Sequence, residues 1–297
     1  MGATAIETAV EKGTETRIGT AWNLARNDAD HSSREPGRKS TAREESDDMK
    51  ISDETLDTLF RGKVRVYQSR SGYRFSLDAV LLAHFVTFRP GEKVADLGTG
   101  NGVIPVLLAY LNSSVFITGV EIQQAMVARA RKNVQLNSFE KRVRILSGDV
   151  CSIESMAEPQ SYDVVVSNLP YRKPSSGRLS PNTEKQIARH EVKAELQDFL
   201  RAGTYLMRGK GRIALIYPAV RSVDLLVSMR EVGVEPKRLR LVYSFAGAEA
   251  ALVLVEGVKG GRGGIKALSP LVIYEQGKRY SMEVKAMLAG STESVSR

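Results

Sequence analysis

A short apolar segment that ends in a glycine-rich turn constrains the fold of this chain more than any other feature. Residues 94–97 are apolar apart from Asp96, residues 98–102 contain three glycines, and apolar residues then recur at helical spacing from Val103 to Leu111. Strand, tight turn and helix in this order open the nucleotide-binding unit of a parallel α/β sheet. The sequence therefore predicts an α/β fold with a ligand-binding turn after its first core strand.

The spacing of the glycines indicates which ligand the turn holds. A dinucleotide fingerprint requires G-x-G-x-x-G, but here Val103 occupies its third glycine position and the actual third glycine is Gly102. Asp96 would repel a phosphate and would suit a ligand with a cationic or hydrogen-bond-donating end. S-adenosylmethionine (SAM) fits this description and carries no phosphate. We predict SAM as the cofactor, bound by Asp96, Gly98, Thr99, Gly100, Asn101 and Gly102. A turn that serves only helix–strand packing is the alternative.

Two later strand ends supply further candidate cofactor ligands. Residues 115–120 are typical of a second strand, and Glu121 and Ile122 follow it. A carboxylate about 20 positions past such a turn accepts hydrogen bonds from a ribose diol. Residues 143–146 are typical of a third strand, after which Asp149 and Val150 suit an adenine amino group and ring. A solvated strand end and a helix cap are the respective alternatives for the two carboxylates.

A second constellation follows the fourth predicted strand. Residues 162–166 form an almost wholly apolar run, which indicates a strand buried on both faces at the centre of the sheet. The motif Asn168-Leu169-Pro170-Tyr171 comes next and therefore lies at the carboxyl edge, beside the glycine turn. The Asn168 amide oxygen and a backbone carbonyl at Pro170 can accept hydrogen bonds from an exocyclic amine, and Tyr171 can stack on a base. We predict these three residues as catalytic, with Asn168 also bordering the cofactor.

Aromatic and basic residues lie on two segments expected near this motif. Arg172 and Lys173 follow it directly, and Tyr73 and Arg74 precede a predicted helix at 76–85 that covers the cofactor from the open side of the sheet. Basic groups beside a base pocket suit phosphate contacts. We predict Tyr73, Arg74, Tyr171, Arg172 and Lys173 as substrate-binding residues. Ordinary packing and a solvated loop are the alternatives.

The composition of the chain changes along its length and divides it into four segments. Residues 1–48 are polar and aperiodic, which predicts a disordered extension, and residues 49–90 form a cap on the catalytic domain. Residues 91–258 alternate strands and helices, which predicts a Rossmann-like, mostly parallel seven-stranded sheet with an antiparallel edge, as in class I SAM-dependent methyltransferases. Residues 259–297 contain a basic glycine-rich loop and a hairpin.

Finer expectations concern the two ends of the fold. We expect a short helical turn at Leu56–Phe60 and a strand at 63–68. Residues 237–245 and 250–256 are predicted to pair as antiparallel strands that close the sheet edge, and residues 271–281 to end the fold as a small hairpin.

The composition argues against several classes of protein. Cys151 is the only cysteine, and the three histidines lack ligand spacing, so we expect neither a disulfide nor a metal site. No apolar run reaches the length of a membrane span and the N-terminus lacks a secretory signal, so we expect a cytoplasmic protein without a membrane segment. The formal net charge of +9 favours a polyanionic partner such as RNA.

From Leu56 onward the chain resembles the bacterial tRNA adenine-N6 methyltransferases, members of the small-methyltransferase class. The resemblance rests on Gln68 with residues 72–83, on residues 96–102, on the Asn168 motif and on residues 188–191. It implies SAM-dependent methylation of the N6 amine of an adenine beside the anticodon of a valine tRNA.

One position departs from that family, which usually has proline where this chain has Leu169. The resulting motif is similar to that of ribosomal RNA adenine dimethylases, which modify the same atom. A ribosomal RNA target therefore stays open, as does a protein-glutamine N5-methyltransferase, because the same motif orients a glutamine amide. A non-catalytic SAM-binding or RNA-binding module is the remaining alternative.

Overall fold

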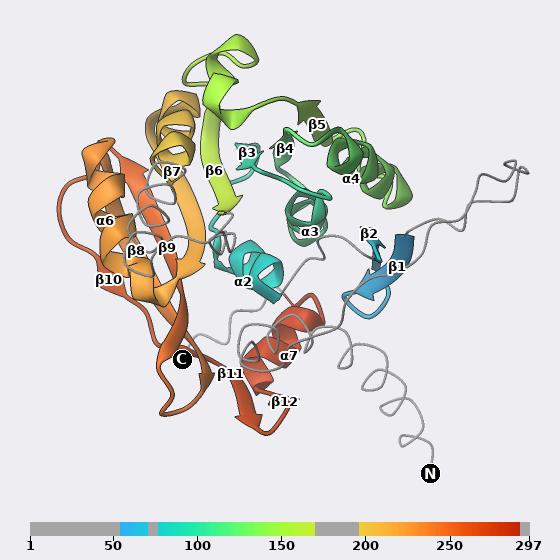
Figure 1. Ribbon diagram of the computed structural model, residues 1–297, viewed down its shortest axis with the longest axis vertical. Helices are drawn as coiled ribbons and strands as arrows, with labels where there is room; N and C mark the ends of the chain where they lie inside the picture. The colour runs from blue at the N-terminus through green and yellow to red at the C-terminus, as the bar shows by residue number, and fades with distance from the viewer. Residues whose placement is uncertain (1–53, 71–76, 170–195, 292–297) are drawn as a thin grey trace, which may run out of the picture.

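The computed structural model describes residues 54–70, 77–169 and 196–291 (Figure 1). Within these residues the strands form one ten-stranded sheet and a separate two-stranded hairpin, with helices on both faces of the large sheet. This arrangement confirms the predicted Rossmann-like fold class. The predicted N-terminal extension at 1–48 lies outside the described residues.

Five parallel strands form the centre of the large sheet. They are β3 (Lys93–Leu97), β4 (Phe116–Glu121), β5 (Val143–Ser147), β6 (Tyr162–Asn168) and β7 (Met207–Pro218). Their order is β5-β4-β3-β6-β7, and every neighbouring pair is parallel. Residues 164–167 of β6 are buried, as expected for an apolar strand covered on both faces.

The antiparallel pair at the edge of this parallel centre was also predicted. Strand β8 (Val234–Phe245) pairs with β9 (Ala250–Lys259), and β9 in turn pairs with β7, in both cases antiparallel. Seven strands thus follow the predicted path, with β6 in the middle.

The prediction that this pair closes the edge of the sheet was wrong, because further strands follow β8. Short strand β10 (Lys266–Ala267) and strand β11 (Leu271–Gln276) both pair with β8 in parallel, and β12 (Arg279–Tyr280) pairs with β11. The predicted C-terminal hairpin therefore exists, but it continues the main sheet. It is followed by a helix that the sequence reading missed, α7 (Met282–Leu288).

Helices cover the two faces of the sheet as two separate hydrophobic layers (Figure 1). One face packs against α2 (Leu77–Phe85), α3 (Val103–Leu111), α4 (Gln124–Leu136) and α7. The other packs against the 3-10 helix η1 (Val150–Ser155), a helix at 196–206 and α6 (Ser222–Glu231), which follows the 3-10 turn η2 (Ala219–Arg221). Every residue of α3 from Val103 to Ala109 is buried, because the helix packs on the sheet and is flanked by α2, α4 and β2.

The hairpin β1–β2 lies outside the main sheet, beside α4 (Figure 1). Strand β1 (Glu54–Leu59) replaces the helical turn that we expected there, whereas β2 (Val64–Ser69) agrees with the prediction. The two strands pair antiparallel from Glu54 with Ser69 to Leu59 with Val64. The spacing of the apolar residues in this short segment fits a helix or a strand, and pairing with β2 decides the outcome.

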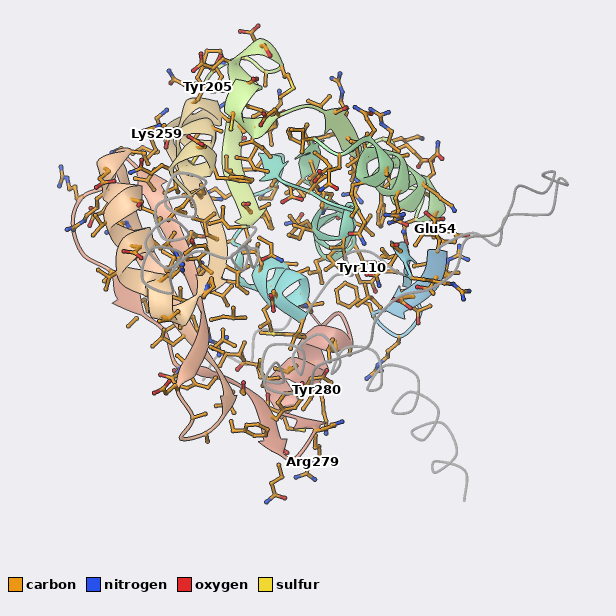
Figure 2. The ribbon with its side chains drawn as sticks, viewed as in Figure 1. Glu54, Tyr110, Tyr205, Lys259, Arg279 and Tyr280 are labelled. Atoms are coloured by element: carbon orange, nitrogen blue, oxygen red, sulfur yellow. The ribbon has the colours of Figure 1, made fainter. Side chains whose placement is uncertain are left out.

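The turn of this hairpin packs against the C-terminal helix. Phe60 is almost fully buried, and its ring lies 5.0 Å from that of Tyr110 on α3, which Figure 2 shows facing the hairpin. Helix α7 ends in a left-handed residue, Gly290, with Ser291 N–H donating to Ala286 O as in a Schellman motif. A Cβ at Gly290 would lie 2.8 Å from Phe60 Cγ, so the helix end and the aromatic ring are in direct contact.

This contact makes a prediction about stability, with a matched control in α6. Gly290→Ala should cost about 2–4 kcal/mol, because it adds a clash with Phe60 to the strain of a left-handed alanine. Gly233, which follows α6 with a similar positive φ, has open space around its Cβ position, so Gly233→Ala should cost only about 1–2 kcal/mol. Urea unfolding of both variants measures the difference. Equal losses of stability would contradict a role for the Phe60 contact.

Candidate functional site

The two motifs predicted from the sequence lie at the ends of adjacent strands. Asp96 on β3 is the register partner of Val166 on β6, so the chain beyond Asp96 and the Asn168 end of β6 leave the sheet side by side. The strand order reverses here, because β4 and β5 lie on one side of β3 and β6 and β7 lie on the other. Open α/β sheets bind ligands at such a switch point, outside the carboxyl ends of the strands.

The segment 98–102, which we call the glycine loop, is held against its neighbours at both ends. Gly98, Gly100 and Gly102 all have positive φ, of 71°, 58° and 77°. The amides of Gly98 and Thr99 both donate to Val120 O on β4, at 3.0 and 2.9 Å. At the other end a Cβ on Gly102 would lie 2.9 Å from Ala130 Cβ, so the loop backbone packs directly on α4. Side chains at these glycines would be incompatible with this path.

Glu121 ties the glycine loop to the end of β4. Its carboxylate accepts from Gly100 N–H through Oε2 and from Gln123 N–H through Oε1, each at 2.9 Å. The side chain is 6% exposed. Each carboxylate oxygen has two lone pairs and uses one of them here. The same group can therefore shape the loop and still accept hydrogen bonds from a ligand.

Asp96 is a buried carboxyl group whose two oxygens have no hydrogen-bond partner within the described residues. It is 0% exposed, and burial raises its pKa to about 7. The nearby Thr99 hydroxyl lowers the pKa in part, although it does not reach good hydrogen-bond geometry, and the Glu121 charge raises it further. A carboxylate in such surroundings is stabilised by a ligand that brings a positive charge or N–H donors.

Further unpartnered polar atoms surround Asp96. Thr99 Oγ1, both amide atoms of Asn101 and Oδ1 of Asn168 are buried and lack partners within the described residues. Buried polar atoms are normally hydrogen-bonded, and each exception calls for an explanation. Their concentration at one edge of the sheet, on residues predicted from the sequence as ligands, is the chemical signature of a binding site.

The other predicted cofactor residues border this cluster. Ile122 follows Glu121 and is 59% exposed, which is unusual for an isoleucine beside a sheet. Asp149 caps η1, since Oδ1 accepts from Cys151 N–H at 2.9 Å, so the capping role that we held as the alternative is present. Val150, the next residue, is buried in the core. The capping bond leaves Oδ2 of Asp149 for another donor.

Several predicted site residues cannot be placed. Six of them, two with predicted catalytic or stacking roles and four basic or aromatic neighbours, lie outside the described residues: Tyr73, Arg74, Pro170, Tyr171, Arg172 and Lys173. Their roles stay predictions.

The sequence reading missed two polar residues that organise this edge. Ser167 Oγ donates to Leu97 O at 2.8 Å, joining the ends of β6 and β3. Asn133 on α4 is 0% exposed and donates from Nδ2 to Asn101 O at 2.8 Å. In the sequence, the only sign of this role is that Asn133 interrupts the apolar face of the helix formed by Ala130 and Val134.

A cavity of about 330 Å³ opens at the opposite edge of the sheet. Its lining includes Lys93, Phe116 and Tyr162, which begin β3, β4 and β6, so it lies away from the glycine loop. In the described part of the chain no helix is long and apolar enough to cross a membrane, and no group of three metal-ligating side chains is found.

The fold and this edge define a methyltransferase of the Rossmann-like class. A family model described as "Methyltransferase domain" matches residues 88–226. A solved structure of a predicted O-methyltransferase from Agrobacterium tumefaciens superposes with a TM-score of 0.60 at 23% identity, over 72% of this chain and 96% of that one. This likeness concerns the fold.

Sequence relatives narrow the class to one family. A Porphyromonas gingivalis protein named tRNA1(Val) (adenine(37)-N6)-methyltransferase is 31% identical over 64% of this chain and 76% of its own length. A homologue of the same name from another strain of that species is 34% identical over 58% and 74%, and one from Parabacteroides distasonis is 28% identical over 65% and 80%. The chain belongs to this family of N-methyltransferases.

The raised pKa of Asp96 predicts how stability depends on pH. The folded carboxyl stays protonated up to about pH 7, whereas the unfolded one ionises near its ordinary pKa of 3.8. The folded state therefore binds the extra proton between these values, and stability falls as pH rises through this window. Between about pH 5 and pH 8, the free energy of unfolding of Asp96→Asn should rise by a few kcal/mol relative to that of the unsubstituted protein. Urea unfolding at each pH measures this difference. Parallel pH curves for the two proteins would contradict a buried, proton-binding Asp96.

Proposed function

We propose that this protein transfers a methyl group from SAM to the exocyclic N6 amine of an adenine in tRNA. By its family, the target is the adenosine next to the anticodon of a valine tRNA, since the relatives are named for adenine 37 of tRNA1(Val). The observation that carries the proposal is that two hydrogen-bond acceptors without partners, the Asp96 carboxyl and Asn168 Oδ1, lie on the ends of neighbouring strands. One suits a cationic cofactor and the other suits an amine substrate.

The residues of the β3–β4 edge fit the parts of SAM. The buried, unpartnered Asp96 carboxylate suits the donors and positive charge of the amino-acid end. Glu121 retains a lone pair on each oxygen for the two ribose hydroxyls. Exposed Ile122 offers an apolar surface to the adenine ring, and the free oxygen of Asp149 accepts from its amino group.

Asn168 would orient the attacking nitrogen. When bound, SAM supplies an electrophilic methyl group on a sulfonium. The lone pair of an adenine N6 amine is delocalised into the ring, which makes the amine a poor nucleophile. A hydrogen bond from the amine to Asn168 Oδ1 favours a tetrahedral nitrogen with its lone pair free to attack. By the resemblance, the Pro170 carbonyl accepts the second N–H and Tyr171 stacks on the base. No strong base is needed, because the methylated nitrogen is acidic and releases its proton readily.

The departure at Leu169 is compatible with the target of the family. Its side chain is 2% exposed and belongs to the hydrophobic layer that includes Leu97 and Leu200. A side chain buried in this layer contributes to the hydrophobic core. The names of the relatives support the tRNA target over a ribosomal RNA target inferred from the motif alone.

A nucleic acid substrate agrees with the charge of the chain. The formal net charge is +9, and a basic protein gains affinity for RNA by releasing counterions from phosphates. The proposed site of action is the cytoplasm, where tRNA is modified.

The proposal is tested by methyl transfer from labelled SAM to unmodified bulk tRNA, to ribosomal RNA and to protein, followed by mass spectrometry of the nucleosides. N6-methyladenosine in tRNA is the expected product. N6-methyladenosine in ribosomal RNA alone would contradict the proposed tRNA target. Label on protein would indicate methylation of glutamine instead. Bound SAM without any transfer would indicate a non-catalytic module.

A substitution at Asn168 tests the chemistry itself. Asn168→Ala removes the acceptor for the amine, so the rate of transfer at saturating SAM should fall about 100-fold or more. The Kd for SAM, measured by calorimetry, should stay within about twofold, because Asp96 and Glu121 are untouched. The control is Thr204→Ala, which removes a buried hydroxyl on the helix at 196–206 that also lacks a partner in the described region. Near-full activity of Asn168→Ala would rule out the amine-orienting role.

A further inference from the structure

Two asparagines, Asn133 on α4 and Asn137 at the C-cap of this helix, bind the main chain of β2 in the same way. Asn133 Oδ1 accepts from Tyr67 N–H at 2.7 Å, and its Nδ2 donates to Tyr67 O at 3.0 Å. Asn137 Oδ1 accepts from Arg65 N–H at 3.0 Å, and its Nδ2 donates to Arg65 O at 2.7 Å. Each side chain thus replaces the peptide group of a neighbouring strand.

The spacing of helix and strand makes this double contact possible. Residues four apart on a helix lie about 6 Å from each other, and residues two apart on a strand lie about 6.6 Å from each other. The edge of β2 that faces away from β1 therefore finds partners on α4 instead of on another strand. An edge strand covered in this way is protected from pairing with other chains.

The two asparagines differ in their remaining N–H. The second N–H of Asn137 donates back to Asn133 O on α4, at 2.8 Å. The second N–H of Asn133 leaves the helix and donates to Asn101 O in the glycine loop, also at 2.8 Å. Asn133 is 0% exposed, and its amide uses both hydrogens and its oxygen, so it joins α4, β2 and the glycine loop at one point.

Because of this bond, the glycine loop is held by side chains from two sides. The loop is held from one side by Glu121, which accepts from Gly100 N–H, and from the other by Asn133, which donates to Asn101 O. The close contact between Gly102 and Ala130 fixes the distance between the loop and α4. The amide of Asn133 therefore determines the orientation of the loop peptide next to the unpartnered Asn101 side chain.

We propose that Asn133 is a positioning residue for the cofactor loop, and that it couples this loop to the β1–β2 hairpin. The part concerning the cofactor rests on the proposed function. Because coupling between two sites is reciprocal, a ligand that orders the glycine loop also stabilises the docked hairpin, and loosening of the hairpin weakens the ligand.

The hairpin has other attachments to α4, so loss of Asn133 should leave the fold intact. Figure 2 shows Glu54 at the border between β1 and α4. Its carboxylate pairs with Arg129 at 3.0 Å and with Lys132 at 2.6 Å, and the Lys132 ammonium lies 3.7 Å from the centre of the Tyr67 ring. These contacts do not involve the glycine loop.

The experiment compares Asn133→Ala with Asn137→Ala. Both variants lose two bonds to β2, but only Asn133→Ala frees Asn101 O. The Kd for S-adenosylhomocysteine, measured by calorimetry without RNA, should rise about tenfold in Asn133→Ala and less than about twofold in Asn137→Ala. Amide hydrogen exchange of residues 98–102 in the ligand-free protein should quicken about tenfold in the first variant only.

Equal effects of the two substitutions on Kd and on exchange would overturn the proposal, because hairpin docking alone would then explain both. If Asn133→Ala does not fold, Asn133→Ser, which keeps a polar side chain too short for the bridge, is measured in its place. The exchange experiment needs no ligand, so its result stands even if methyl transfer to tRNA is not observed. If no methyl transfer is observed but exchange of residues 98–102 quickens only in Asn133→Ala, the proposed function is contradicted and the role of Asn133 is not.

Discussion

Strand β6 pairs with β3 and not with β5, the strand that precedes it in the chain, and the functional edge depends on this one pairing. The chain crosses over β3 and β4 between β5 and β6, so two segments that are distant in sequence end next to each other. The Ser167 hydroxyl secures the junction by its bond to Leu97 O. A carboxylate from one strand and an amide from the other are thereby presented to the same space.

The polar side chains around that space lower the stability of the folded chain when no ligand is bound. Asp96, Thr99, Asn101 and Asn168 contain most of the buried side-chain polar atoms that lack partners in the described part of the molecule. Each such atom lowers stability unless a ligand supplies the missing hydrogen bond. The backbone around them is, by contrast, well bonded, through Val120, Glu121 and Asn133. The protein thus keeps unsatisfied side chains on two strand ends and on a firmly held loop, which is how a binding site is preorganised.

Much of this edge could be predicted because its signals are local. The apolar runs of β3 and β6, the three glycines and the carboxylate after β4 each appear within a few residues of sequence. Strand β1 was predicted wrongly because pairing, not periodicity, decides its conformation. Helix α7 and the extension of the sheet by β11 depend on contacts with β8, which a short amphipathic segment does not reveal. The bridge made by Asn133 joins three segments, so no single stretch of sequence announces it.

The contact between Phe60 and Gly290 can form only after the end of α7 has been synthesised. A ribosome makes the hairpin turn before the other described helices and the end of α7 after them. Until α7 emerges, Phe60 can pack against Tyr110 but lacks its cover at Gly290, and part of its ring stays in water. The nascent chain therefore carries a partly exposed aromatic group until α7 is made, and a product truncated before α7 would keep this group exposed to aggregation.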